Sequence, residues 1–384
     1  MEEFYLLDNE LNKKYIIDTY SSAIWASRYN DIGDCELVIS ASEENFKKIE
    51  ECKYIARNDD DMVCKIKKIN LKTDEENGDE LILTGIDITD ILNQRIVVKQ
   101  TNFNGLVEDY IRTLINDSII KPTDADRRIK NFLLADKVGF SDAIREQVTY
   151  DYVGNKVKEL CKQYGWGYRV TVHNNNFVFV LYMGRDISKY ITFSHNYDNI
   201  STTDYSKDDS NIKNVALIAG EGEGVARRTT TIGKGVGIDR HELYVDARSV
   251  SSEIDYDELL INYPNGKEKV INNVIYYQVN GSNIAIITKN DAEEVTNVQL
   301  CNNIYIENLR NTGYEKMAAY TSVTSFSGEI IVGMSYQYKK DYKLGDIVKI
   351  VNEYGISINV RISEVIENRD DNGYTMEPTF ENIE

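Results

Sequence analysis

Short apolar stretches rich in Ile, Val, Tyr and Thr recur along the whole chain, separated by polar turns. In Cys35-Glu36-Leu37-Val38-Ile39 apolar and polar residues partly alternate, as in a strand with one buried face. Similar stretches predict a hairpin around Asp8-Asn9-Glu10 and further strands at about 53–57, 62–73 and 79–90. The chain contains three prolines and 27 tyrosines, and this composition also favours strands over helices.

A helical period replaces this pattern in several places. Ser42 predicts the N-cap of a short helix. Apolar residues recur at helical spacing over residues 106–115 and again over 153–164. We therefore expect an α+β unit at residues 101–199.

The strand pattern then returns, at about 168–182, 190–195, 213–219, 227–232 and 240–246. The stretch 267–299 predicts a small sheet with a turn at Asn280-Gly281. A helix is expected at about 303–320, although Gly313 weakens its middle. The remaining residues, from Ser322 to Phe380, are predicted to be strands and turns.

An internal repeat is the most informative pattern. Residues 54–83 can be laid over residues 348–376, so that Lys65-Ile66 matches Arg361-Ile362. Each segment then contains an Asn-Gly pair, Asn77-Gly78 in the first and Asn372-Gly373 in the second, and this is the strongest short signal for a hairpin. Two strand-rich segments could also match this loosely by chance. If the duplication is real, one strand-rich unit lies near each end of the chain.

The charge balance argues against stable nucleic-acid binding. The chain has 63 acidic and 44 basic side chains and a formal net charge of −19, whereas phosphate neutralisation needs a basic surface. The simplest explanation is solubility; a sharper one is a surface that DNA passes without sticking. The first residues are acidic and no run of about 18 apolar residues occurs, so we expect neither a secretory signal nor a membrane span.

The sequence lacks the usual signatures of catalysis. The three histidines, His173, His195 and His241, show no metal-binding spacing. Gly220-Glu-Gly222-Glu-Gly224 and Gly233-Lys-Gly235-Val-Gly237 fit neither a dinucleotide loop nor a Walker loop, and are read as turn or bulge glycines. The many acids make any single carboxylate pair uninformative. We therefore predict no catalytic residue, no cofactor and no metal.

The cysteines occur without a Cys-x-x-Cys pair, which favours buried, reduced thiols over a disulfide or metal role. They are Cys35, Cys52, Cys64, Cys161 and Cys301.

Particular residues resemble the siphophage tail-hub family, the tail-associated baseplate hubs of the virus-type Gp37-like kind. The resemblance runs from about residue 15 to 380 and rests on five motifs in order. They are Trp25-x-x-Arg28 with Gly33-x-Cys35-Glu36-Leu37; Leu217-Ile-Ala-Gly220-Glu-Gly-Glu-Gly224 with Ala226-Arg227; Asp239-Arg-His-Glu242-Leu-Tyr-Val-Asp246-Ala-Arg248; Gly313-x-Glu315-Lys316-Met-Ala318; and Tyr342-x-Leu344-Gly345-Asp346-Ile-Val348.

The resemblance implies a fold and an assembly. Members of that family are similar to the central hub of contractile-phage baseplates, in which two related β-barrel tube domains per chain give a trimer of six-fold appearance. The implied fold class is mainly β with α+β insertions, with two β-barrel tube domains and two smaller accessory domains. The first barrel would take 1–100 with about 200–238, and the second 239–266 with 321–384. The accessory domains would be 101–199 and 267–320.

The resemblance also implies partners and a location. We expect a homotrimer in the virion tail tip, made in the host cytoplasm, that contacts a distal tail or tail tube protein, the tape measure protein and other baseplate or fibre proteins. DNA would be a partner only in transit. Two alternatives stay open: a tail-associated peptidoglycan-degrading enzyme, and a receptor- or carbohydrate-binding tail-tip protein.

Two acidic runs are candidates for the channel. Asp59-Asp60-Asp61 and Asp370-Asp371 are expected at equivalent places in the two repeats, at the ends or in the lumen of the barrels. Acidic walls would let DNA slide because both surfaces are negative.

Overall fold

The computed structural model describes residues 3–73, 78–98, 101–148, 150–327, 330–331 and 335–383. The chain forms two compact units, the first made of residues 1–206 and 324–384 and the second of residues 207–323.

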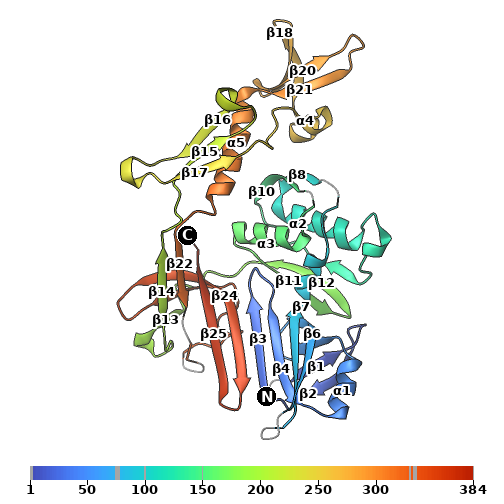
Figure 1. The fold of residues 1–384 in the computed structure, drawn as a ribbon, viewed down its shortest axis with the longest axis vertical. Helices are drawn as coiled ribbons and strands as arrows, with labels where there is room; N and C mark the ends of the chain where they lie inside the picture. Colours follow the sequence, from blue (N-terminus) through green and yellow to red (C-terminus); the bar gives the residue numbers. More distant parts are fainter. Residues whose placement is uncertain are drawn as a thin grey trace. The chain divides into compact units, whose positions relative to one another are not determined.

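A large sheet dominates the first unit (Figure 1). Its order is β14-β22-β25-β24-β3-β4-β7-β6-β5-β1-β2, while β23 also pairs with β24 and β13 pairs with β23. The helix α1 (Glu43–Glu50) connects β4 to β5 and, as predicted, is capped by Ser42, which accepts a hydrogen bond from the Asn45 N–H. The strands are β1 (Phe4–Leu7), β2 (Lys13–Ile17), β3 (Ser22–Arg28), β4 (Asp34–Ser40), β5 (Tyr54–Arg57), β6 (Val63–Lys72), β7 (Glu80–Asp87), β13 (Thr192–Ser194), β14 (Asp204–Asp208), β22 (Val323–Ser327), β23 (Ile347–Val351), β24 (Ser357–Asp370) and β25 (Gly373–Asn382).

Two five-stranded sets within this sheet have the same order. The first set runs β3-β4-β7-β6-β5 and the second β14-β22-β25-β24-β23. Pairings within the first set are antiparallel, as are β22·β25, β25·β24 and β24·β23. The predicted repeat covers the last three strands of each set in chain order, β5-β6-β7 and β23-β24-β25.

A bulge lies at the same position in both sets. The register of β6 on β7 shifts between Ile66 and Lys68, and that of β24 on β25 shifts between Ile362 and Glu364. Each shift follows directly after the Lys65-Ile66 and Arg361-Ile362 pairs on which the repeat was aligned. A bulge strengthens the local twist and fixes the register of its strand, so the likeness extends to backbone geometry.

The turns predicted from Asn-Gly pairs lie where expected. Asn372 precedes Gly373, which begins β25 with a φ of 126°. In the second unit Asn280 and Gly281 both have positive φ, as a tight hairpin turn requires. Gly78 also has positive φ, while Asn77 lies outside the described residues.

Helices and a three-stranded sheet lie between the two sets in the sequence. Here α2 and α3 share a core with the sheet β11-β12-β9, and α3 ends at Gly165 in the left-handed conformation. The elements are η1 (Ile88–Gln94), β8 (Thr101–Leu106), α2 (Val107–Ile115), η2 (Asn116–Ile120), η3 (Ala125–Arg127), β9 (Phe132–Leu134), β10 (Ala143–Val148), α3 (Val153–Tyr164), β11 (Gly167–His173), β12 (Asn176–Tyr182) and η4 (His195–Tyr197).

The second unit contains two small sheets. One is β16-β15-β17, packed against α5, and its strands lie on both sides of the boundary between 238 and 239 that the resemblance implies. The other is β18-β19-β20-β21, packed against α4. The elements are β15 (Val215–Ala219), η5 (Gly224–Ala226), β16 (Thr229–Gly233), η6 (Gly237–Asp239), β17 (Glu242–Asp246), α4 (Tyr256–Asn262), β18 (Lys267–Ile271), β19 (Val274–Val279), β20 (Ser282–Lys289), β21 (Val295–Leu300) and α5 (Asn302–Met317).

Gly313 has a packing role in α5. A Cβ atom at this position would lie 2.6 Å from Cγ1 of Ile218 and 3.0 Å from Cδ1 of Ile232. Only glycine allows α5 to approach the sheet this closely, which explains why a residue of low helix propensity lies in its middle.

The predicted fold class is confirmed in its main feature, a mainly β chain with α+β insertions. Among the described residues none of the sheets closes on itself, so the two barrels stay a prediction. No helix in the described part of the chain is long and apolar enough to cross a bilayer.

Candidate functional site

The two five-stranded sets meet where β24 pairs with β3. We call this pairing the central joint. Before its bulge β24 pairs with β23, and after the bulge residues 364–369 pair antiparallel with residues 28–23 of β3. The Tyr29 N–H donates to the Ser363 carbonyl oxygen at 2.9 Å and extends the joint by one bond. Both ends of the chain are thereby held in one sheet (Figure 1).

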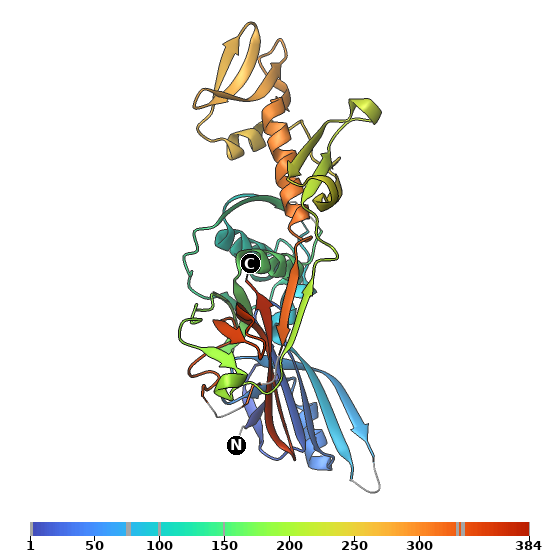
Figure 2. The same ribbon diagram turned by 90° about the vertical axis from the view of Figure 1, so that its left-hand side faces the viewer.

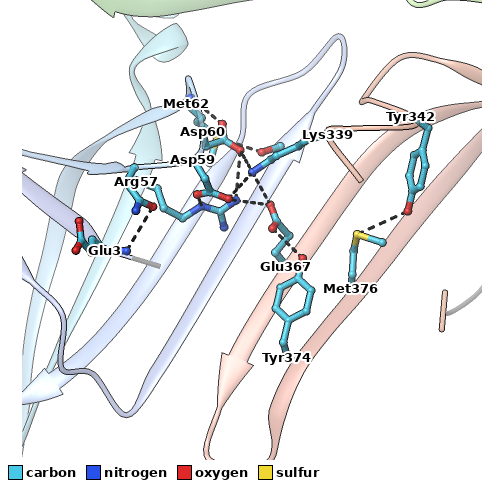
Figure 3. Close-up of polar contacts among 12 residues, drawn as sticks. Glu3, Arg57, Asp59, Asp60, Met62, Lys339, Tyr342, Glu367, Tyr374 and Met376 are labelled. Atoms are coloured by element: carbon cyan, nitrogen blue, oxygen red, sulfur yellow. Dashed lines mark hydrogen bonds and ion pairs between the residues drawn. The ribbon is translucent and has the colours of Figure 1, made fainter. Parts of the chain in front are cut away.

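An ion-pair cluster lies on the buried side of this joint (Figure 3). Arg57, at the end of β5, is 1% exposed, and its Nη2 lies 2.5 Å from Oε1 of Glu367 in β24. Its Nε lies 2.6 Å from Oδ1 of Asp59. Tyr374 donates its hydroxyl hydrogen to the other oxygen of Glu367 at 2.9 Å. The cluster therefore ties the turn after β5 to β24 and β25.

Lys339 completes the cluster from the segment before β23. Its Nζ lies 2.8 Å from Asp60 Oδ2, 3.2 Å from Asp59 Oδ2 and 3.3 Å from Glu367 Oε1. Burial alone would raise the pKa of Asp60, but the charges of Lys339 and Arg57 outweigh burial and lower it. The pKa of Lys339 is raised, because Asp60 and Glu367 outweigh its burial and the repulsion from Arg57. Asp60 and Lys339 are therefore both charged at neutral pH.

The other side of the joint is a polar face. Here Arg28 lies 2.6 Å from both Glu364 and Asp34, so one guanidinium bridges β3, β4 and β24. The cross-strand pairs place further charged residues on this face. Its carboxylates include Asp34, Glu36, Glu80, Glu364, Glu377 and Glu381, and its cations include Arg28, Lys65, Lys68, Lys72 and Arg361, which pairs with Glu381. Ile82, Ile86 and Ile366 lie between these charges on the same face. The opposite face of the same strands carries core residues such as Trp25, Leu37, Leu83, Val365 and Phe380.

The predicted acidic runs are placed differently from expectation. Asp59, Asp60 and Asp61 lie in the turn between β5 and β6, whereas Asp370 and Asp371 lie in the hairpin between β24 and β25. These turns are not equivalent, so that part of the prediction was wrong. Asp59 and Asp60 also form ion pairs with Arg57 and Lys339, so the cations of the cluster balance their negative charges.

The acids of the polar face were missed, although the sequence contains a signal for them. In β25, polar and apolar residues alternate strictly from Thr375 to Glu381, and the burial alternates with them. Such a strand has one buried and one solvated face. Its acids Glu377 and Glu381 lie on the solvated face.

A cleft of about 730 Å³ lies in the first unit beside the cluster. Its walls mix charges: Asp59, Asp60 and Asp61 lie near Arg169, Arg185, Lys339 and Lys343. Arg169 stacks over the ring of Tyr182 with 4.6 Å between its Cζ and the ring centroid. Thr171 and His173, both from β11, also line this cleft.

The histidines and the glycine runs lie in strands, in a 3-10 helix and in turns. In the described residues no group of three or more His, Cys, Asp or Glu side chains could hold a metal. His173 and His195 belong to β11 and to η4, and His241 directly precedes β17. The glycine runs lie in the turns from β15 to β16 and from β16 to β17, with Gly222, Gly224, Gly233 and Gly237 at positive φ.

The cysteines are free thiols, as predicted. Four of them are buried and Cys301 is half-buried. Burial, with the neighbouring acid Glu51, raises the pKa of Cys52 to about 11, so that this thiol stays protonated at neutral pH.

Comparisons with known proteins agree with this structure. A family model described as "Siphovirus ReqiPepy6 Gp37-like protein" matches residues 3–380. No curated protein matches the chain in sequence. The fold is similar to that of the tail protein from Neisseria meningitidis MC58, with a TM-score of 0.54, 12% identity, and coverage of 100% of this chain and 97% of that one. It is similar to the prophage MuSo2 43 kDa tail protein from Shewanella oneidensis, with a TM-score of 0.54, 10% identity and coverage of 99% and 98%.

We predict that Arg57→Met destabilises the first unit by about 3 kcal/mol, because it leaves Asp60 and Glu367 with Lys339 as their remaining close cation. Chemical denaturation followed by circular dichroism measures the loss. Lys48→Met, which removes a surface ion pair with Glu44, is the control and should change the midpoint little. An Arg57→Met chain as stable as the wild type would show that the cluster does not hold the joint.

The lowered pKa of Asp60 predicts a pH-dependent stability. Its carboxylate stabilises the fold above the ordinary pKa of 3.8, and this contribution disappears as the pH falls through the lower pKa of the folded state. Asp60→Asn should therefore be less stable than the wild type at neutral pH. The gap should close in strongly acidic solution. Denaturation midpoints of both proteins across a pH series measure this, and a gap independent of pH would contradict it.

Proposed function

The chain belongs to the siphovirus Gp37-like family of phage tail proteins, and on that premise we propose that it is a structural hub of the tail tip. In this proposal three copies form a ring of six-fold appearance, which continues and closes the tail tube and leaves a channel for DNA ejection. The family match confirms the resemblance predicted from the sequence motifs.

The observation that carries the proposal is the pair of five-stranded sets with one order and one bulge position. A chain with two like sets offers six like elements in a trimer, which matches a three-fold assembly to a six-fold tube. The common fold with the Neisseria tail protein and the Shewanella prophage tail protein supports the same proposal. In this view the two barrels close when neighbouring chains complete the sheet.

The polar face is our candidate for the channel lining, in place of the acidic turns. Duplex DNA carries one negative charge per about 1.7 Å of its axis, and at physiological salt repulsion acts over about 8 Å. Glu36, Glu377 and Glu381 would therefore keep DNA from binding to the wall. The net charge of −19 is consistent with such a surface.

The partners follow from this place in the particle. A hub at the tail tip would contact a distal tail or tail tube protein, the tape measure protein and other baseplate or fibre proteins, and would meet DNA only in transit. We propose no catalytic role.

The oligomeric state tests the proposed function. Sedimentation of the purified full chain over a concentration series should reach three times the chain mass of 44.0 kDa, and class averages of the particles should show a ring of six similar lobes. A chain that stays monomeric in solution and in isolated tail tips would contradict the ring. Clearing of a peptidoglycan gel by the same protein would contradict the structural role and favour a wall-degrading enzyme.

Neutralising the polar face should slow genome ejection. In Glu36→Gln/Glu377→Gln/Glu381→Gln we expect assembled particles with slower release of DNA, because the lining would no longer repel the phosphates. Glu43→Gln/Glu44→Gln/Glu50→Gln is the control, since it changes the charge equally on α1. Release of DNA from triggered particles, followed with an intercalating dye, measures the rate. Equal rates in both variants would argue against this lining.

A further inference from the structure

The edge of β24 is shared by two partners. Before the bulge it pairs with β23, where the Ile362 N–H donates to the Asp346 carbonyl oxygen at 3.0 Å. After the bulge the same edge pairs with β3. The bulge thus marks the point at which one set ends and the next begins.

The equivalent strand β6 repeats the first half of this arrangement. Before its bulge β6 pairs with β5, and the Ile66 N–H donates to the Lys53 carbonyl oxygen at 2.8 Å. After the bulge, residues 68–72 pair with β7 on one side. On the side that β3 occupies in the case of β24, the described part of the chain provides no strand. Figure 2 shows this end of the β6–β7 hairpin at the margin of the sheet.

The strand that corresponds to β3 in the second set is β14. It lies at the end of the strand order, pairs with β22 and has all five residues exposed. Residues 68–72 of β6 and Asp204–Asp208 of β14 are therefore two open edges of this sheet, and β2 lies at the other end of its strand order. The edges of β6 and β14 correspond to the two edges that meet in the central joint.

We propose that residues 68–72 of one copy pair antiparallel with β14 of a second copy, which repeats the central joint between chains. This inference rests on the proposed ring and supplies its interface. Paired end to end, the strands place Lys68 opposite Asp208 and Lys72 opposite Asp204, so two unlike charges face each other across the strands. Leu71 then lies opposite Tyr205.

Exposed apolar side chains support this pairing. Ile69 is 49% and Leu71 48% exposed in β6, and Tyr205 is 36% exposed in β14. An open edge strand with apolar side chains invites association with another strand unless something covers it. A second copy of the chain covers both edges at once.

The charges also select the partner. In the central joint the anion Glu364 lies on β24 and the cation Arg28 on β3. In the proposed joint the cation Lys68 holds the position of Glu364, directly after the bulge, and the anions lie on β14. Because the polarity is reversed, β24 of one chain would place Glu364 against the acids of a foreign β14. The wrong combination is therefore disfavoured.

Charge reversal tests the proposal. Lys68→Asp/Lys72→Asp and Asp204→Lys/Asp208→Lys should each reduce the trimer to monomers in sedimentation, while the chain with all four changes should recover the trimer. Lys267→Asp/Lys269→Asp on the exposed strand β18 is the matched control and should stay trimeric. Unchanged circular dichroism and melting temperature show that each variant folds.

A disulfide tests the register independently of charge. Asn70→Cys/Ser206→Cys places two thiols opposite each other, and mild oxidation should give chains linked in pairs and triples on a non-reducing gel. Asn70→Cys/Lys207→Cys should give no such ladder, because neighbouring side chains of a strand point to opposite faces. A wild-type chain that stays monomeric would overturn the ring and this interface together. This interface alone would be overturned if the trimer persists in both charge-reversed chains and the Asn70→Cys/Ser206→Cys chain forms no linked products on oxidation.

Discussion

The first unit depends on the backbone pairing of β24 with β3, because this pairing joins residues that lie 336 positions apart in the chain, as in Arg28 and Glu364. Closing so long a loop costs chain entropy, and a one-residue slip would exchange the two faces of the sheet. The bulge after Ile362 and the cluster around Arg57 work against such a slip. The bulge fixes where β24 changes partner, and Arg57 reaches Glu367 only in the correct register.

A buried ion pair is a poor source of net stability, since its desolvation offsets most of its attraction. The position of this cluster suggests why it is nevertheless suited to the joint. Arg57 lies near the N-terminus, whereas Lys339 and Glu367 lie near the C-terminus. The cluster can therefore form only when these distant segments meet. An unpaired buried charge would be costly in any other arrangement. The cluster therefore penalises wrong pairings more than it stabilises the right one.

Local patterns predicted much of the fold, and long-range pairing accounts for what they missed. The Asn-Gly turns, the Ser42 cap and the helices of the α+β unit depend on neighbouring residues, so the sequence contains their signals. The repeat was recognised only over β5-β6-β7 and β23-β24-β25, where each set is contiguous. The other two strands of the second set, β14 and β22, are separated by residues 209–322, and no local period can connect them. The acidic run Asp59-Asp60-Asp61 was interpreted from its charge alone, whereas its partner Lys339 lies 280 positions from Asp59 in the sequence.

The reversed polarity of the two joints has a consequence for assembly. If both joints had the same charges, either open edge of one chain could replace an internal strand of another, and chains could exchange strands. With Glu364 on β24 and Lys68 at the same place on β6, the internal and external joints repel each other's partners. A chain would therefore close its own joint first and expose the second pair of edges unchanged. Each chain that joins the ring contributes one set of each kind, so the two kinds alternate around the ring. The ring therefore contains an even number of sets whatever its size.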